Sequence, residues 1–467
     1  MGFLLEKNAY IFSLFGKAIS KLFQMENHMD NREMRDHHLI RQFENNSDFK
    51  SEYSEMCGVE VLICYLDTLV DTAASVELKK LMGELNVSPE SWKPLDAEIN
   101  VGIDQLENAI LTGRLVILHA TGSLVLKPKM RQLERSVTSP ESETSIQGSS
   151  DAFTESILYN IGILRKHLRS SRLNIQEMDM GEISRRKIAV CYLPNTPGES
   201  IAKRILALLQ ARKNREINSV QDLAKALGQR YWSPVPLFFT SELPEDTSTL
   251  LLKGRVVLLL DQLPFALVTP TIISDLWTVD SDKNMSQTIV VTLCALRIIG
   301  IIISLLVPGL YVALVSINPE LFRIEMALSV AKSREGVPYP AIIEMILMLI
   351  VIEMIVSASI RLPKTVGPTI TMVGGIILGQ AAVQAQLVSN LLLIVLSATV
   401  ISNYTFVGTQ NALMIRLFKY CNVLLGSIFG VLGILAGLVG TLFYFASITS
   451  FQVPFLGLGM RAEGTDE

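Results

Sequence analysis

The stretch RLPKTVGPTITMVGGIILGQAAVQAQLVSN, from Arg361 to Asn390, is apolar and carries no charge after Lys364. Lipid offers no hydrogen-bond partners, so its carboxamides must face protein or a water-filled cavity. A helix that only anchors a protein has no use for such side chains. The stretch therefore predicts a membrane protein whose spanning helices pack closely, assemble or conduct. Its glycines are Gly367, Gly374, Gly375 and Gly379, and its carboxamides are Gln380, Gln384, Gln386 and Asn390.

The composition around this stretch predicts two halves. The chain has 467 residues, of which 49% are hydrophobic, and its net charge is −4. Charges recur every few residues before about residue 285, whereas long apolar runs dominate after it. We therefore expect a soluble half followed by a membrane half. Because no basic stripe interleaved with aromatic residues is present, nucleic-acid binding is excluded.

The soluble half contains two stretches of the same pattern, Gly113–Pro128 and Gly254–Pro270. Both begin with Gly-Arg, continue with aliphatic residues, a short turn and further apolar residues, and end at proline. Each predicts a β-hairpin.

A matched strand precedes each hairpin, at Val61–Thr68 and Lys187–Asn195, and both strands contain Cys-Tyr-Leu. An amphipathic helix follows each strand, at residues 76–85 and 201–211. These repeated elements predict two α+β subdomains of similar plan, at roughly 50–130 and 180–275. Polar residues 135–150 predict a loop, and a helix that connects the subdomains is expected from Asp151 onward.

No residue pattern in the soluble half points to an enzyme, a cofactor or a metal. Residues 1–23 predict an amphipathic helix, which docks on its own domain or lies on a membrane surface. The cysteines form no CxxC pair, so reduced, buried thiols are expected. They are Cys57, Cys64, Cys191, Cys294 and Cys421.

Long apolar runs in the membrane half predict spans at about 287–307, 341–360, 366–383, 388–408 and 419–448. The basic residues Arg361, Lys364, Arg416 and Lys419 are expected in two short loops. The positive-inside rule places such loops, and with them the soluble half, in the cytoplasm. Residues 318–340 are charged and amphipathic, which favours a position at the membrane interface. The last stretch is long for one span and short for two, so the span count and the side of the C-terminus stay open.

Five glycines in the last stretch are spaced by 4, 3, 4 and 3 residues, which predicts one small-residue face on a helix. That face packs within one bundle, or it contacts another subunit or a pore. The glycines are Gly426, Gly430, Gly433, Gly437 and Gly440.

Three charged residues fall within the predicted spans. Arg297 lies in the first span, and Glu344 and Glu353 lie on opposite faces of the second. Glu344 is near a helix start, so we interpret it as a capping or interfacial residue. Glu353 lies deeper, where an unpaired carboxylate costs ~3 kcal/mol. It should pair with Arg297 or face water.

With these motifs in place, the chain resembles the A subunits of nutrient-germinant receptors of endospore-forming bacteria, the GerA family, over about residues 40–450. Departures from the family pattern occur at Val356 and Ser357, at Thr240–Asp246 and at Ser145–Phe153, so the chain is either a standard receptor subunit or a divergent paralogue. The matching pieces are Tyr65–Asp71, Ser233–Pro236, Gly254–Asp261 with Pro264 and Phe265, Arg334–Pro340, Glu344, Glu353, Arg361–Pro363 and Val373–Val383.

The resemblance implies a non-enzymatic subunit of a complex in the inner spore membrane, with a transporter-like B subunit and a lipoprotein C subunit. The A subunit is expected to form a homo-oligomer, with a pentamer as one form, and to provide or gate an ion-release path. The alternatives are a non-conducting scaffold that clusters the complex, and a secondary transporter, which would require a repeat that the membrane half lacks. Candidate residues for the path are Arg297, Glu353, Gln380 and Gln384, and candidates for helix packing or oligomerisation are Gly375, Gly379 and the five later glycines.

The fold class predicted is thus an α+β soluble half of two similar subdomains, followed by an α-helical polytopic membrane domain. The expected segments are an N-terminal amphipathic extension (1–45), subdomain 1 (46–135), a linker with its connecting helix (136–178), subdomain 2 (179–285), a membrane domain of four to six helices (286–450) and a C-terminal tail (451–467).

Overall fold

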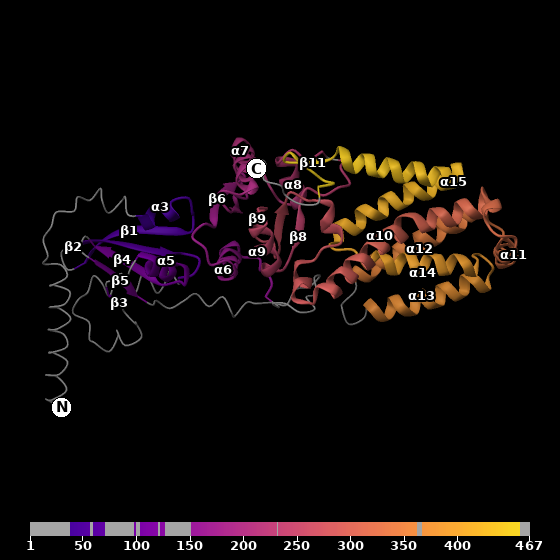
Figure 1. Cartoon of the computed structure of the whole chain (residues 1–467), viewed down its shortest axis with the longest axis horizontal. Coiled ribbons are helices and arrows are strands. Elements are labelled where there is room, and N and C mark those ends of the chain that lie inside the picture. The colour runs from indigo at the N-terminus through magenta and orange to yellow at the C-terminus, as the bar shows by residue number, and fades with distance from the viewer. Residues whose placement is uncertain are drawn as a thin grey trace, which may run out of the picture. The chain divides into compact units, whose positions relative to one another are not determined.

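A computed structural model describes residues 38–56, 59–70, 98–99, 103–119, 122–126, 151–230, 232–361 and 367–457 (Figure 1). The chain divides into two compact units. The soluble unit comprises residues 1–229, 240–269 and 460–467, and the membrane unit comprises residues 230–239 and 270–459. The helices predicted at 1–23 and 76–85 and the loop at 135–150 lie outside the described residues.

The soluble unit contains two five-stranded sheets with the same strand order. The first runs β1-β2-β4-β5-β3 and the second runs β6-β7-β9-β10-β8. Strands of the first sheet are β1 Phe49–Met56, β2 Val59–Leu66, β3 Glu98–Ile99, β4 Leu115–His119 and β5 Gly122–Leu126. Those of the second are β6 Asn174–Met180, β7 Arg186–Tyr192, β8 Phe239–Ser241, β9 Val256–Leu260 and β10 Ala266–Thr269.

The register confirms that the soluble half is built twice. Cys64 of β2 pairs with Val116 of β4, and Cys191 of β7 pairs with Val257 of β9. Both predicted hairpins are present as the antiparallel pairs β4–β5 and β9–β10. Strand β6 begins at Asn174, ahead of the start at 179 expected for the second subdomain.

A helix ends two residues before the glycine that opens each hairpin. Gly113 follows α5 with φ 78°, and Gly254 follows α9 with φ 82°. Glycine terminates a helix in this way because the left-handed conformation costs it nothing. These two helices were missed from the sequence. The helices of the soluble unit are α3 His38–Phe43, α5 Ile103–Leu111, α6 Ile157–His167, α7 Pro197–Ala211, α8 Val220–Ala226 and α9 Pro244–Leu252.

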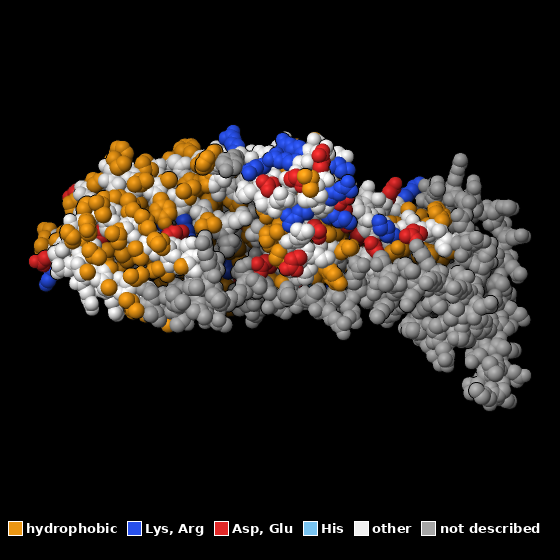
Figure 2. All heavy atoms as spheres, turned by 180° about the vertical axis from the view of Figure 1, so that it is seen from behind, with side chains coloured by type: hydrophobic (Ala, Val, Ile, Leu, Met, Phe, Trp, Pro, Cys, Tyr) orange, Lys and Arg blue, Asp and Glu red, His pale blue; other side chains and the backbone are white. Residues whose placement is uncertain are grey.

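The membrane unit is helical, and its surface is largely hydrophobic (Figure 2). Three helices are long and apolar enough to cross a membrane, namely those at 287–316, 341–359 and 410–447 among the described residues. The helix α14, with 14 residues, rises about 21 Å, which is less than a hydrocarbon core of about 30 Å. The helices are α10 Gln287–Ser316, α11 Ile324–Ser333, α12 Ala341–Arg361, α13 Gly367–Gln384, α14 Asn390–Asn403 and α15 Thr409–Ser447.

Helix α15 is a helical hairpin, which explains why the last apolar stretch had an unsuitable length for one span. Gly430 has non-helical dihedrals, φ 63° and ψ −145°, and separates two legs at 409–429 and 431–447. The legs fold back on each other, because the rings of Phe418 and Phe445 lie 5.1 Å apart. Both legs are visible in yellow-orange in Figure 1.

The hydrogen bonds define two ends of the membrane unit. At the end we call the base, Ser304 of α10 donates to Asn403 near the end of α14 at 2.6 Å, and the backbone N–H of Val407 donates to Leu276. At the opposite end, the tip, Tyr311 of α10 contacts Ser389 at the start of α14 at 3.0 Å. The helices α10 and α14 are therefore antiparallel.

The C-terminal segment of the membrane unit returns to the base. Phe455, which follows the second leg of α15, packs with Leu276 and Phe445 in a buried cluster. Its carbonyl oxygen accepts from the backbone N–H of Ile273 at 2.7 Å. The chain thus enters the membrane unit and leaves α15 at the same end.

One loop expected from the sequence is absent. Arg416 and Lys419 lie inside the first leg of α15, and Lys419 is only 2% exposed. The positive-inside rule assigned these two basic residues to a loop, because a charge within an apolar helix has the same local sequence pattern as a charge that separates two helices. The break between the predicted spans at 366–383 and 388–408 is confirmed, since α13 ends at Gln384 and α14 begins at Asn390.

Candidate functional site

The three charged residues found within the predicted spans, Arg297, Glu344 and Glu353, each pair within the chain. Glu353 of α12 accepts from Arg416 of α15 at 2.9 Å, and the exposed side-chain fractions are 36% and 14%. The expectation that Glu353 pairs with Arg297 is wrong. Local patterns do not identify Arg416 as the partner, because the predicted span begins at residue 419 and leaves Arg416 in a loop.

Arg297 lies at the base of the unit instead. Its guanidinium pairs with Asp282 and donates to the carbonyl oxygen of Trp277 at 3.1 Å. Asp282 belongs to a short 3-10 helix, Asp280–Asn284, just before α10. This pair therefore fastens the start of α10 to the segment that leads into it.

Glu344 lies in a buried polar cluster at the tip, in agreement with a capping role. Its carboxylate accepts from the backbone N–H of Ser389 at the start of α14. It also lies 3.5 Å from the Arg334 guanidinium. Glu344 is 1% exposed, so the cluster ties the start of α12 to the turn between α13 and α14.

The predicted polar face of α13 is exposed in the single chain. Gln380 and Gln384 both lie at the surface, one helical turn apart. A side chain added at Gly375 or Gly379 would meet nothing within 4 Å. The structure therefore leaves these four candidates at the surface, whereas Arg297 and Glu353 have partners within the chain.

The five glycines of α15 do not form one helical face, and that expectation is wrong because Gly430 breaks the helix. Gly426 faces α10, where a Cβ atom would lie 3.0 Å from the carbonyl oxygen of Gly309. Gly433 and Gly437 face the first leg of α15, against Leu425 and Asn422, whereas Gly440 has open space beside it. Close packing by Gly426, Gly433 and Gly437 takes place within the chain.

Asn318 is a structural residue that the sequence did not reveal. It follows α10, and its Oδ1 accepts from the backbone N–H of Val431 at 3.1 Å. A Cβ atom at Gly430 would overlap the same oxygen. Asn318 therefore caps the second leg of α15 and requires glycine at the turn.

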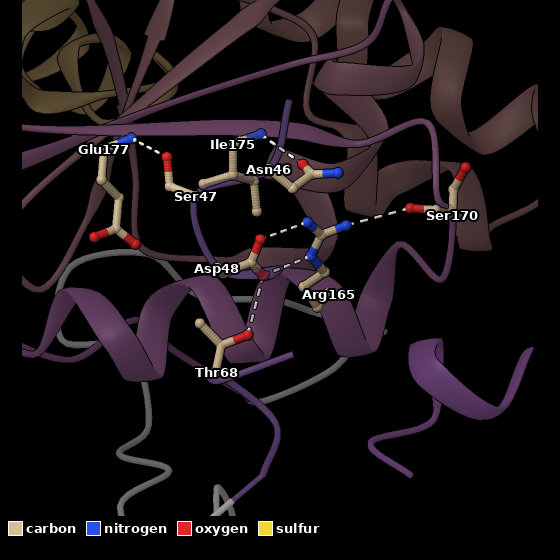
Figure 3. Close-up of polar contacts among 8 residues, drawn as sticks. All are labelled: Asn46, Ser47, Asp48, Thr68, Arg165, Ser170, Ile175 and Glu177. Atoms are coloured by element: carbon tan, nitrogen blue, oxygen red, sulfur yellow. Dashed lines mark hydrogen bonds and ion pairs between the residues drawn. The ribbon is translucent and has the colours of Figure 1, made fainter. Parts of the chain in front are cut away.

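The soluble unit contains a second polar site, which joins the two sheets (Figure 3). Arg165 of α6 donates from Nε and Nη2 to the two carboxylate oxygens of Asp48, at 3.0 and 2.8 Å. Thr68 donates to the same carboxylate at 3.2 Å. Asp48 and Arg165 are 3% and 1% exposed, so this is a buried, two-point ion pair.

Backbone contacts reinforce this junction. The N–H of Ser47 donates to the carbonyl oxygen of Ile175 at 2.8 Å, and the N–H of Ile175 donates to Asn46 at 3.0 Å. The segment before β1, at the edge of the first sheet, thus lies along β6, at the edge of the second. We call the pair Asp48–Arg165 and these contacts the sheet junction.

The thiols of the soluble unit are shielded. Cys64 and Cys191 are buried and free. Burial raises the pKa of the Cys64 thiol to about 12, and burial likewise raises the pKa of Cys191. Both thiols therefore stay protonated and unreactive, whereas Cys421 of α15, expected to be buried, is exposed.

The sequence matches the family described as Bacillus/Clostridium GerA spore germination protein over residues 37–465. The chain belongs to the GerA family. The resemblance based on the motifs is thus confirmed, and among its described residues this member has three helices that are long and apolar enough to span a membrane.

Three family relatives are similar over most of their length. Spore germination protein GerLA of Bacillus cereus is 32% identical and covers 74% of this chain and 71% of its own. Spore germination protein B1 of Bacillus subtilis (strain 168) is 29% identical over 78% of this chain and 75% of its own. Spore germination protein A1 of the same strain is 26% identical over 96% of this chain and 91% of its own.

One solved structure is also similar, the crystal structure of the N-terminal domain of the A subunit of the Bacillus megaterium spore germinant receptor GerK3. It covers 50% of this chain and 92% of that domain, with 18% sequence identity and a TM-score of 0.36.

Proposed function

We propose that this chain is the membrane subunit of a nutrient-germinant receptor, and that it oligomerises and forms or gates an ion-release path that starts germination. The observation that carries the proposal is the exposure of Gln380 and Gln384 on α13. A carboxamide facing lipid leaves its donors and acceptor unpaired. Water in a pore or polar groups of another subunit would satisfy them.

The glycines of α13 support assembly of several copies. Gly375 and Gly379 are one turn apart and leave open space beside the helix. Small residues at this spacing let another helix approach closely in lipid. The glycines of α15 are occupied within the chain, so α13 is the better candidate for contact with a second copy.

The membership of the GerA family supports the rest of the proposal. The chain would reside in the inner spore membrane with its soluble half in the cytoplasm, as a homo-oligomer alongside a transporter-like B subunit and a lipoprotein C subunit. Because the chain enters and leaves the membrane unit at the base, the soluble half and the C-terminal segment would share one side.

Ion flux through liposomes tests the proposal. Vesicles that hold the purified protein, alone and together with the B and C subunits, should release monovalent cations. Replacing Gln380 and Gln384 with leucine should reduce the flux by an order of magnitude or more, while Leu378→Ala should not. Leu378 is a matched control because it is exposed at 47% and lies ~160° around the same helix from Gln380. Vesicles that stay sealed with all three subunits present would overturn the proposal.

A non-conducting scaffold is the second candidate, and the internal pairing of charges favours it. Arg297 pairs with Asp282, and Glu353 pairs with Arg416, so neither charge needs a water-filled path. On this interpretation, leucine at positions 380 and 384 leaves germination intact, whereas disruption of the soluble unit abolishes receptor clustering. Spore germination assays and fluorescence imaging of the two variants separate the candidates.

A further inference from the structure

Ten residues within the soluble half of the sequence belong to the membrane unit. Residues 230–239 join the membrane unit, whereas the chain on either side, up to residue 229 and from 240 to 269, belongs to the soluble unit. The segment contains Trp232 and the family-like motif Ser233–Pro236. Neither feature has a part in the proposed ion path.

The segment is fixed at the base of the membrane unit. Val235 is 2% exposed and packs in the buried cluster that holds Met414 and Phe445 of α15. The hydroxyl of Thr271 donates to the carbonyl oxygen of Pro236 at 2.9 Å. The motif therefore holds this segment against the ends of the membrane helices.

Trp232 lies at the surface of this fixed segment. Its side chain is 88% exposed, and the neighbouring Arg230 is also exposed. At the same end, Tyr404 follows α14 and is 67% exposed. Exposed tryptophan and tyrosine beside arginine, at the end of a helical membrane bundle, is the composition of the headgroup region. There the ring is partly desolvated and the guanidinium meets lipid phosphate.

We propose that residues 230–239 form a second membrane anchor, in which Trp232 inserts at the headgroup level of a phospholipid bilayer and Arg230 contacts lipid phosphate. Lipid is the occupant that the structure favours, because the segment packs against apolar membrane helices through Val235 and carries an exposed tryptophan next to an exposed arginine. The chain leaves the anchor at Phe239 and enters β8, the edge strand of the second sheet.

Depth-dependent fluorescence quenching tests the anchor. Trp232 becomes the sole tryptophan of the full chain after Trp92→Phe and Trp277→Phe, and the protein is placed in phosphatidylcholine–phosphatidylglycerol vesicles. Phospholipids brominated near the headgroup should quench its emission at least twofold. Aqueous acrylamide should quench it less than it quenches a tryptophan placed at Ile183.

The matched control places a tryptophan at Ile183, in a background where Trp92, Trp232 and Trp277 are all phenylalanine. Ile183 is 92% exposed in the turn between β6 and β7 of the soluble unit, so its exposure in the single chain is close to the 88% of Trp232. Brominated lipid should leave its emission unchanged. Equal quenching by lipid at both positions would overturn the proposal. Protection of Trp232 from acrylamide without lipid quenching would also overturn it and would indicate contact with another protein or a second copy.

A measurement that retains all native tryptophans covers the case in which the substituted chain fails to fold. The wild-type chain carries 5-fluorotryptophan, and Trp232→Phe serves only to assign the fluorine resonance. A spin-labelled lipid should broaden the Trp232 resonance strongly. Broadening by a water-soluble relaxation agent alone would contradict the anchor.

Discussion

The side chain of Asn318, just beyond the end of α10, accepts a hydrogen bond from the backbone N–H of Val431 at 3.1 Å. The two residues lie 113 positions apart in the sequence. This contact caps the second leg of α15 and makes Gly430 the fold point of the hairpin. It therefore decides that the last apolar stretch turns back toward the base.

Substitution of Gly430 should disrupt the hairpin. Alanine there would adopt a conformation that is reserved for glycine and would overlap Asn318 Oδ1, which costs ~1–3 kcal/mol for the backbone alone. We expect a loss of melting temperature in detergent, read by differential scanning fluorimetry. Gly440→Ala is the matched control, since open space surrounds Gly440, and it should melt like the wild type. Equal melting of the two variants would argue against the turn at Gly430.

The ion pair between Glu353 and Arg416 should show charge reciprocity. Glu353→Gln leaves the guanidinium unpaired within the membrane unit, and we expect destabilisation of ~2–4 kcal/mol. The exchange Glu353→Arg with Arg416→Glu should restore at least half of the loss. Unfolding in mixed micelles measures both variants. If the exchanged pair is no more stable than the single variant, the two residues do not act together.

The sheet junction should be a major source of stability in the soluble unit. Asp48→Ala leaves Arg165 buried without its partner, and we expect a cost of ~3–5 kcal/mol. Pulse proteolysis of the full chain, with cleavage sites mapped to 38–70 and 151–180, reports the change. Lys203→Ala, which removes an exposed pair with Glu199, is the control and should be as stable as the wild type. If Asp48→Ala is as stable as the Lys203→Ala control, the buried pair is dispensable for stability.

The hairpin of α15 predicts the side of the C-terminal segment. A cysteine at Gln452, after the second leg, should react with a membrane-impermeant maleimide from the same side of sealed, oriented vesicles as a cysteine at Ile183. A cysteine at Ser329 on α11, at the tip, should react only from the other side. Reaction of positions 452 and 329 from the same side would contradict the hairpin.

Much of this architecture was accessible from the sequence because the relevant signals are local. The Gly-Arg hairpins and the Cys-Tyr-Leu strands predicted a repeated α+β plan, and the identical strand orders confirm it. The apolar runs predicted helices near 287, 341, 367 and 390 for the same reason. The carboxamides of α13 were also found, because polar groups in an apolar run are visible without any knowledge of contacts.

Pairings over long sequence separations were not accessible. The partner of Glu353 is 63 positions away, and that of Asp48 is 117 away. Nothing in a local pattern distinguishes Arg416 in a helix from an arginine in a loop. The break at Gly430 was hidden as well, because its spacing to Gly426 and Gly433 suits a continuous helix.

The central claim is that Gln380 and Gln384 line a water-filled ion path between copies of this chain. Cysteine at position 380 or 384, in a chain with Cys421→Ser, should let a charged methanethiosulfonate reagent block cation flux through liposomes that hold the assembled receptor. Cysteine at 378, on the opposite side of α13, should leave the flux unchanged. Flux that is insensitive at 380 and 384, or equally sensitive at 378, would contradict the path.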